Sequence, residues 1–408
     1  MLSIHRFVSC ILLLTKHHDF ARRWASSSSS SRSTSSTTRS TRTSSNNEFE
    51  AQLDNTSFRI FEFREDFGFY KWTPSTQINR TLEEVQLNEE FLRMIDPNGM
   101  PNHCVEPTSL SMPIQFSSFE TSLTTPQQIH KCCYPYGQDD FAGLFVAKYH
   151  RGIDFENIDF VFGGRTLNML ATQTPFDDYY KRDQRLSYYY ATVIPGTKSI
   201  LVTRRKTYEQ DYQSRSFQFE RIMTGKTVNE PHKVESTYHL QTMTIGGRHR
   251  VLFNAEADAL YANHPIEIKM NKQKYWGSQV FFQMVSCGSP YFCHGLVGKT
   301  GVEGVDIKPL WKVANIMHSG IGPLKKKEPS IHIMEERILN YMDSLKSLMS
   351  QAKEGQIFRI HFCPNGDLKL IKIIGKTDPC LTMLPPEAIV RELTVANATI
   401  NSRTNHIQ

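Results

Sequence analysis

Short stretches in which apolar and polar residues alternate recur along most of the chain. Alternation with a period of two is typical of a strand with one buried face, and β-branched and aromatic residues favour the same structure. The pattern predicts strands at Ser57–Phe63, within 159–174 and 186–204, and at Arg248–Leu260, Ile266–Met270 and Phe292–Val297. Tyr261 to Pro265 are expected to form a short turn. The chain is therefore expected to build extended sheets.

A second pattern, with apolar residues three or four positions apart, predicts helices between the strands. The clearest helix begins after Ser330, a residue type that caps helix N-termini, and stops before Gly355. Its apolar face is expected to comprise Met334, Ile338, Tyr341, Leu345, Leu348 and Ala352. Further helices are predicted at Glu209–Thr224 and at Lys272–Ser286, with Gly288 just past the end of the latter.

Near the C-terminus, two strands at Ile357–Phe362 and Leu368–Ile374 flank Pro364-Asn365-Gly366, which is a strong turn sequence. Strands and helices are interspersed without an internal repeat. This mixture predicts an α+β or mixed α/β fold in which mixed β-sheets are flanked by helices. One folded domain is expected over residues 51–385, between an N-terminal tail of residues 1–50 and a C-terminal tail of residues 386–408.

The N-terminal tail differs in composition from the rest of the chain. Residues 26–45 contain only Ser, Thr and Arg, so this segment has too little apolar surface to fold and is expected to be disordered. Residues 1–45 have a net charge of +6, whereas the remaining residues comprise 40 basic and 40 acidic residues and are neutral overall. A polyanionic partner would therefore have to bind a local patch of the folded region.

Three interpretations of the first residues are open. Their basic, acid-poor composition resembles a mitochondrial transit peptide, and a secretory signal is the weaker interpretation because no small-residue cleavage site follows Leu14. An untargeted tail would place the protein in the nucleus or the cytoplasm, which is the location we expect, with the mitochondrion as the alternative. No apolar run reaches the roughly 18 residues that a membrane span requires. The eight cysteines form no C-x-x-C pair and indicate reduced thiols.

Acidic and basic residues gather where two of the predicted strands meet. Because side chains two positions apart in a strand share a face, Glu256 and Asp258 are expected to point the same way, with Ala257 behind them. Glu267 and Lys269 share a face of the next strand in the same manner. The short turn allows the two strands to pair, so three carboxylates and one ammonium would meet on one surface.

Three carboxylates this close repel one another, and a hard divalent cation relieves the repulsion. Mg²⁺ prefers carboxylate oxygens, water and substrate phosphate, and two such ions can activate water and hold the leaving oxygen in phosphodiester cleavage. Lys269 suits the negative charge of the phosphate in the transition state. The pattern predicts a metal-assisted phosphoester hydrolase. A solvated pair of strands is the alternative, and Glu256 counts against it by adding a further like charge.

The order and spacing of these residues resemble known enzymes. Asp258-x8-Glu267-x-Lys269 has the spacing of the D-ExK metal-site hairpin of the restriction-endonuclease-like superfamily. Four ordered segments resemble the DXO decapping exoribonuclease family, over about residues 60–375. They are Gly246–Asp258 with the Glu-hydrophobic-Asp motif, Ile266–Lys269 with the Glu-hydrophobic-Lys motif, the helix sequence Tyr275–Gln279, and Ser216–Glu220.

The resemblance implies a role for each matching residue. Metal ions would be bound by Glu220, Glu256, Asp258 and Glu267, with the Ile268 carbonyl as a further ligand. Lys269 and Gln279 would contact the phosphate that is cleaved, and the cofactors would be Mg²⁺ or Mn²⁺, as two divalent ions. The family acts on RNA 5′ ends. It removes incomplete or non-standard caps, including NAD caps in some members, can release pyrophosphate from triphosphate ends, and often degrades RNA from 5′ to 3′.

The sequence departs from the family at a motif that grips substrate phosphate, Trp-Arg-Gly-x-Leu. The matching stretch is Phe162–Leu167, in which Gly164 takes the arginine position and Arg165 follows one place later. A one-residue shift turns a strand side chain to the opposite face, although a bulge at the two glycines would bring Arg165 back. Both interpretations are open. His239 lies where the family often has a residue lining the substrate, and a structural histidine is the alternative.

The resemblance thus implies an RNA 5′-end decapping nuclease, with RNA 5′ ends as its substrate and a 5′–3′ exoribonuclease as a candidate partner. We expect a monomer without membrane association. One alternative is a diverged protein that binds RNA ends or a nuclease without turnover, which the shifted Arg165 motivates. Another is a DNA-directed enzyme with the same metal-site geometry.

Overall fold

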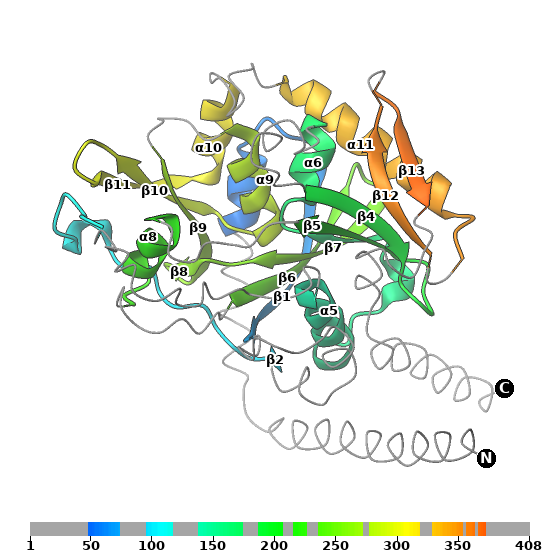
Figure 1. Cartoon of the computed structure of the whole chain (residues 1–408), viewed down its shortest axis with the longest axis horizontal. Helices are drawn as coiled ribbons and strands as arrows, with labels where there is room; N and C mark the ends of the chain where they lie inside the picture. The colour runs from blue at the N-terminus through cyan, green and yellow to red at the C-terminus, as the bar shows by residue number, and fades with distance from the viewer. Residues whose placement is uncertain are drawn as a thin grey trace, which may run out of the picture.

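Strands and helices alternate along the computed structural model, as expected for a fold of mixed class (Figure 1). The structure describes residues 48–73, 95–116, 138–173, 187–206, 215–226, 236–271, 277–318, 329–353, 356–363 and 366–372. Most of both predicted tails, and the predicted boundary at residue 385, lie outside the described residues. The folded region includes residues 48–54, which are helical, and Phe49 is buried in the core, so the fold begins within the predicted N-terminal tail.

The strands form two sheets, one of nine strands and one of four. The order across the large sheet is β13 (Leu368–Lys372), β12 (Ile357–Phe362), β4 (Ser187–Val193), β5 (Ile200–Lys206), β3 (Phe160–Gly163), β7 (His249–Glu256), β6 (Ser236–Ile245), β1 (Phe61–Trp72) and β2 (Ile95–Asp96). The order across the small sheet is β11 (Val302–Pro309), β10 (Tyr291–Val297), β9 (His264–Asn271) and β8 (Ala259–Tyr261). Parallel pairs join β3 to β5 and β7, and β9 to β10, whereas the other pairs are antiparallel. The predicted mixed sheets are confirmed.

Helices cover both faces of the large sheet (Figure 1). The helices are α5 (Gln138–Phe145), α6 (Thr166–Thr172), α8 (Arg215–Met223), α9 (Gly277–Cys287), α10 (Leu310–His318) and α11 (Ile331–Met349), with short helical turns at Pro107–Ser109, Val146–His150 and Phe155–Asn157. Along β3, Phe160 and Phe162 pack in the core with α6, α9, α10 and α11, whereas Val161 packs in a second core with α5. The alternation of the strand therefore fills two apolar layers, one on each face.

The helix predicted after Ser330 is confirmed as α11. The Ser330 hydroxyl accepts a hydrogen bond from the Ile333 backbone N–H, which caps the first turn. Most of the predicted apolar face is buried, but Leu348 is 45% exposed. Met342 and Met349 are buried in addition to the predicted residues, so the buried face lies slightly to one side of the one we expected.

The strand predicted within 159–174 is only half right, because β3 ends at Gly163 and α6 follows. Every residue from Thr166 to Ala171 is buried. A helix that is buried on all sides shows no helical periodicity, so its sequence resembles a buried strand. Other boundaries also differ: β1 begins and ends later than Ser57–Phe63, and residues 209–214 and 272–276 of the predicted helices lie outside the described residues.

The strand predicted as Arg248–Leu260 is two strands in two different sheets. β7 ends at Glu256 in the large sheet, and β8 begins at Ala259 in the small one. The chain crosses between the sheets at Ala257 and Asp258. The two acidic residues therefore do not lie on one continuous strand face, and they flank the junction between the sheets instead. Among the described residues, no helix has the length and the apolar character needed to cross a bilayer.

Candidate active site

A tight hairpin at the edge of the small sheet brings Asp258 beside β9. Ala262 and Asn263 both have positive φ angles, of 49° and 67°, and reverse the chain between β8 and β9. Asp258 immediately precedes β8, and its Oδ2 accepts a hydrogen bond of 2.7 Å from the Ile268 backbone N–H. The backbone of β9 therefore fixes the position of this carboxylate.

The ammonium of Lys269 lies among three carboxylates. Its Nζ is 2.8 Å from Glu267 Oε1, 3.0 Å from Asp258 Oδ2 and 3.7 Å from Glu220 Oε1. It also donates a hydrogen bond of 2.9 Å to the Ile268 carbonyl oxygen. The structure thus brings together residues from β9, the sheet junction and α8.

Helix α8 holds Glu220 at the site through its neighbour Phe219. The Phe219 ring is fully buried among Ile266, Ile268 and Cys293 of the small sheet. It fits because residue 295 is a glycine: a Cβ atom there would lie 2.6 Å from the Phe219 Cζ atom. The close approach at Gly295 lets α8 lie directly on the sheet, which places Glu220 beside Lys269.

Glu256 reaches the site from the large sheet. It is the last residue of β7 and is exposed, and its Oε1 accepts a hydrogen bond of 2.8 Å from the Ser236 hydroxyl at the start of β6. The negative charge of Glu256 contributes to raising the pKa of Glu220. The sequence did not single out Ser236. In the structure Ser236 lies two residues before Tyr238, which pairs with Glu256 across β6 and β7, and no local sequence pattern marks it.

Burial makes the carboxyl groups of Glu220 and Glu267 weak acids. Burial raises the pKa of Glu220 to about 8; Lys269 opposes this rise, and the carboxylates of Asp258, Glu256 and Glu267 add to it. The pKa of Glu267, whose side chain is 3% exposed, is raised to about 7, again mainly by burial. For Lys269, burial lowers the pKa, but Asp258, Glu267 and Glu220 outweigh burial and raise it well above its usual value. The cluster holds more negative charge than one ammonium neutralises.

The donor chemistry of the cluster fits a hard divalent cation. The carboxylates of Glu220, Glu256, Asp258 and Glu267 supply only oxygen atoms, which such ions prefer. In the described part of the chain, however, no group of three or more acidic, His or Cys side chains already surrounds a common metal position. The Lys269 ammonium lies between the carboxylates instead, so a bound ion requires that ammonium to move aside.

Arg165 lies close enough to act on the carboxylates. It follows β3 and Gly164, where a Cβ atom would lie 3.3 Å from the Cβ of Ala255, next to Glu256. The positive charge of Arg165 lowers the pKa of Glu267 and so partly offsets the effect of burial. The part of this arginine in gripping phosphate stays a prediction.

Neither Gln279 nor His239 contacts the site carboxylates of Glu220, Glu256, Asp258 and Glu267. Gln279 is half-buried in the first turn of α9, and its amide donates a hydrogen bond of 3.4 Å to Gln283. His239 on β6 is 3% exposed, and its ring nitrogens lie 2.8 Å from Asp66 Oδ1 and 2.6 Å from the Cys287 carbonyl oxygen. The part of either residue in substrate binding stays a prediction.

Comparison with known proteins identifies the fold. No family model matches the sequence, and no curated protein matches it either. Solved structures match over most of the chain. Scheffersomyces stipitis Rai1 in complex with (3′-NADP)⁺ and calcium ion has a TM-score of 0.54 at 10% identity, covering 84% of this chain and 97% of that chain. S. pombe Rai1 in complex with 3′-FADP has a TM-score of 0.52 at 13% identity, covering 79% and 98%. The chain has the mixed α+β fold of the Rai1 proteins.

Proposed function

We propose that this protein is a metal-dependent hydrolase of RNA 5′ ends, acting on incomplete or non-standard caps, including NAD caps. The observation that carries the proposal is the convergence of Glu220, Asp258 and Glu267 on the Lys269 ammonium. The fold supports it, because Rai1 structures of the same fold are complexes with 3′-FADP and with (3′-NADP)⁺ and calcium ion. Pyrophosphate release and 5′–3′ exoribonuclease activity belong to the same proposal.

The residues of the site divide the work of phosphate-bond hydrolysis. Glu220, Glu256, Asp258 and Glu267 would hold the divalent ions, with the Ile268 carbonyl as a further ligand. When bound, Mg²⁺ or Mn²⁺ supplies Lewis acidity and lowers the pKa of water. The Lys269 ammonium would contact the phosphate and stabilise its charge.

Substrate is oriented by the positive charges next to the carboxylates. Arg165 lowers the pKa of Glu267 through its charge, and its guanidinium would contact a phosphate bound at the cluster. A guanidinium binds phosphate through paired N–H donors, which fixes orientation as well as charge. Gln279, at the N-terminal end of α9, is assigned a contact to the same phosphate by the family resemblance. The positive charges of Arg165 and Lys269 would then complement the negative RNA end.

Hydrolysis of a panel of RNAs tests the proposal. The purified chain is incubated with Mg²⁺ or Mn²⁺ and RNA carrying a 5′-triphosphate, a 5′-monophosphate, an unmethylated cap or an NAD cap, beside DNA of the same sequence. The Asp258→Asn, Glu267→Gln double variant should be folded and inactive. Glu303→Gln is the matched control, because Glu303 is an exposed carboxylate of the same sheet that caps the Lys299 N–H. Absence of any product from wild-type protein would reject the proposal, and cleavage of DNA alone would reassign the substrate.

A binding protein without turnover is the second candidate. The position of the Lys269 ammonium between the carboxylates favours it, because an ion pair of this kind neutralises acidic side chains without a metal. Calorimetric titration with Mn²⁺ separates the candidates: an enzyme of the proposed kind binds the ion, whereas a protein whose carboxylates serve only Lys269 does not. Pull-down with a 5′–3′ exoribonuclease tests the proposed partner, and sedimentation tests the proposed monomer.

The proposed location is the nucleus or the cytoplasm, with the mitochondrion as the alternative. Imaging of the full chain and of a chain that lacks residues 1–45 tests it. Mitochondrial signal that disappears with the deletion would establish the alternative.

A further inference from the structure

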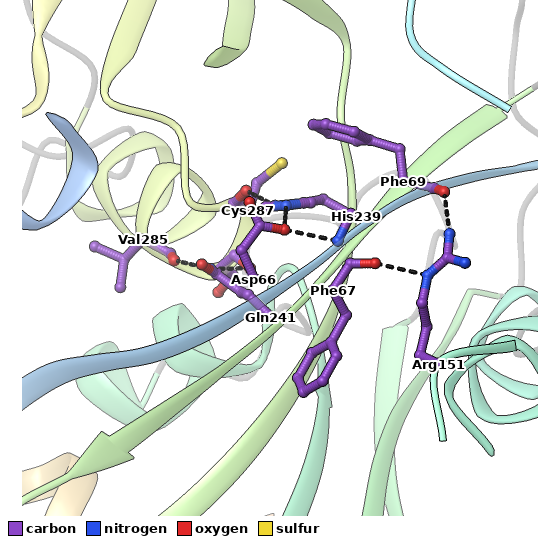
Figure 2. A network of polar contacts seen from close by, with 10 residues as sticks. Asp66, Phe67, Phe69, Arg151, His239, Gln241, Val285 and Cys287 are labelled. Carbon is purple, nitrogen blue, oxygen red and sulfur yellow. Dashed lines mark hydrogen bonds and ion pairs between the residues drawn. The ribbon is translucent and has the colours of Figure 1, made fainter. Parts of the chain in front are cut away.

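Asp66 on β1 and His239 on β6 form a buried pair beside the C-terminal end of α9 (Figure 2). The His239 Nε2 atom lies 2.8 Å from Asp66 Oδ1, and its Nδ1 atom lies 2.6 Å from the Cys287 carbonyl oxygen. The Phe69 ring is stacked on the imidazole, with the ring centroids 4.4 Å apart. The imidazole therefore joins the large sheet to the last residue of a helix.

Both ring nitrogens of His239 face acceptors, so both must donate and the ring is an imidazolium. Burial lowers the pKa of His239, but the charge of Asp66 and its hydrogen bond, together with the side chain of Cys287, outweigh burial and raise it to about 10. A cation at the C-terminal end of a helix is favourable, because unpaired carbonyl groups leave that end partly negative. Gln241 adds to the cap, since its amide donates to the carbonyl oxygens of Val285 and Ser286 at 2.8 and 2.9 Å.

The sheet side of the pair is itself firmly held. Asp66 Oδ1 accepts a hydrogen bond of 2.6 Å from the Gly68 N–H at an irregularity of β1. The Arg151 guanidinium donates to the carbonyl oxygens of Phe67 and Phe69, at 2.6 and 3.0 Å (Figure 2). Asp66 thus projects from a braced segment of strand, so the helix end is tied to a rigid part of the sheet.

The helix end in turn supports the strand end that carries the acidic residues. Cys287 is buried in a cluster with Ala255 and Ala257, which Phe69 partly covers. These alanines alternate with Glu256 and immediately precede Asp258. A shift of Cys287 would remove the surface on which this segment lies. Contacts therefore run from Asp66 through His239 and Cys287 to the backbone of two acidic site residues.

We propose that the Asp66–His239 pair is a positioning device for the carboxylates of Glu256 and Asp258 and for the helix that carries Gln279. The inference rests on the proposed function, because positioning has a catalytic consequence only if these carboxylates hold metal ions. In this role His239 acts through Cys287, in place of the substrate-lining role that the family resemblance gives it. Mutation of residues that orient metal ligands without binding the metal typically lowers metal affinity or activity by about 10- to 100-fold.

His239→Gln, Asp66→Asn and the double variant test the proposal in the full-length protein. Mn²⁺ affinity is measured by calorimetry, and kcat and KM are measured on 5′-triphosphate RNA. Each single variant should weaken Mn²⁺ binding and lower kcat by about 10- to 100-fold, with the KM for RNA unchanged. The double variant should be no worse than the poorer single variant, because the two residues act as one unit.

Asp343→Asn is the matched control. Asp343 pairs with His249 at 2.8 Å, the same separation as in the proposed device, but at the opposite end of β7. His249 is buried to the same extent as His239. This variant should lower Tm and leave kcat and Mn²⁺ affinity as in wild type. If His239→Gln likewise lowers Tm but leaves kcat and Mn²⁺ affinity unchanged, the pair is merely structural and the proposal is overturned.

Amide hydrogen exchange separates this inference from the proposed function. If wild-type protein binds no Mn²⁺ and hydrolyses no RNA, the proposed function fails, and exchange alone then decides the positioning role. Faster exchange at residues 255–258 and 284–287 in His239→Gln, but not in Asp343→Asn, supports positioning. Unchanged exchange at these residues overturns it.

Discussion

Phe219 and Gly295 approach so closely that no larger residue than glycine fits at position 295. A Cβ atom there would lie 2.6, 2.9 and 3.0 Å from the Cζ, Cε1 and Cε2 atoms of the ring. The ring lies in the apolar core beneath the small sheet, and the next residue along α8 is Glu220. The distance of Glu220 from the other carboxylates is therefore set by the size of residue 295.

Gly295→Ala should displace α8 from the sheet and move Glu220 away from Lys269. Overpacking of a buried site typically costs about 1–3 kcal/mol, so the free energy of unfolding should fall by that amount. RNA hydrolysis and Mn²⁺ affinity should fall further than the loss of stability explains. Denaturant unfolding and calorimetry measure the two effects. Gly304→Ala is the control, because a Cβ atom at Gly304 of β11 would meet nothing within 4 Å. Equal behaviour of the two variants would contradict the role given to the close approach.

The raised pKa values of Glu220 and Glu267 predict a stability that depends on pH and on metal. A carboxyl whose folded pKa is above its unfolded value binds protons more tightly when folded, so its stabilisation is full below about pH 4.5 and is lost as the pH rises through about 7 to 8. The Tm of metal-free protein should therefore fall between about pH 5 and about pH 8. Mn²⁺ should raise Tm most at the upper end of this range, where no protons compete for the ligands.

Scanning calorimetry over this pH range, with and without Mn²⁺, measures the effect. In the Glu220→Gln, Glu267→Gln double variant, Tm should neither fall with pH in this range nor rise on addition of Mn²⁺, because the variant has neither titrating group. A wild-type slope no steeper than that of the double variant would show that these carboxyls are ordinary acids in solution.

Lys269→Met should separate metal binding from catalysis. Without the ammonium, Asp258 and Glu267 lose the positive charge that lies 3.0 and 2.8 Å from them, so metal-free protein should be less stable and Mn²⁺ should restore its Tm. Mn²⁺ affinity should be retained or increased, because the ion no longer displaces a cation. Hydrolysis should fall by about 10²- to 10³-fold, as on loss of one group that stabilises transition-state charge. Lys346→Met, which breaks an exposed pair with Asp159, is the control. Loss of Mn²⁺ binding together with activity would show that Lys269 holds the site together instead.

Sequence pattern predicted most strands from their β-branched and aromatic residues, and it predicted the long helix α11 because that helix has one buried and one open face. It failed for α6, where residues such as Leu167 and Asn168 are buried on every side and periodicity disappears. It also joined β7 and β8, because Ala257 is as apolar as its strand neighbours and nothing in the local sequence marks a change of sheet. Such boundaries depend on tertiary contacts that a local pattern does not contain.

The acidic residues of the site were accessible from the sequence because like charges on strands a short turn apart are conspicuous. The residues that hold these acidic side chains in place could not be predicted from the sequence. Asp66 and His239 are 173 residues apart in the chain, and nothing in either local sequence indicates the pair. The approach of Phe219 to Gly295 likewise depends on how a helix and a strand from separate segments pack together. The grouping of Asp258, Glu267 and Lys269 was thus predictable, whereas the contacts that hold these residues in place required the structure.

Arg165→Ala should weaken substrate binding and also disturb the carboxylates. A hydrogen bond to a charged group contributes about 1.5–3 kcal/mol, so kcat/KM on triphosphate RNA should fall by about 10- to 150-fold. Arg165→Lys keeps the charge but not the paired donors, so it should recover only part of the loss.

The pKa of Glu267 should rise in the alanine variant, because Arg165 lowers it in the wild type. Mn²⁺ binding should therefore weaken at neutral pH and recover as the pH is raised. Steady-state kinetics and Mn²⁺ titrations at several pH values measure both effects. Arg248→Ala, at the opposite end of β7 beside Asp343, should change neither. Wild-type kinetics in Arg165→Ala would mean that the one-residue shift has removed the arginine from phosphate binding, and the effect on Glu267 alone would then remain.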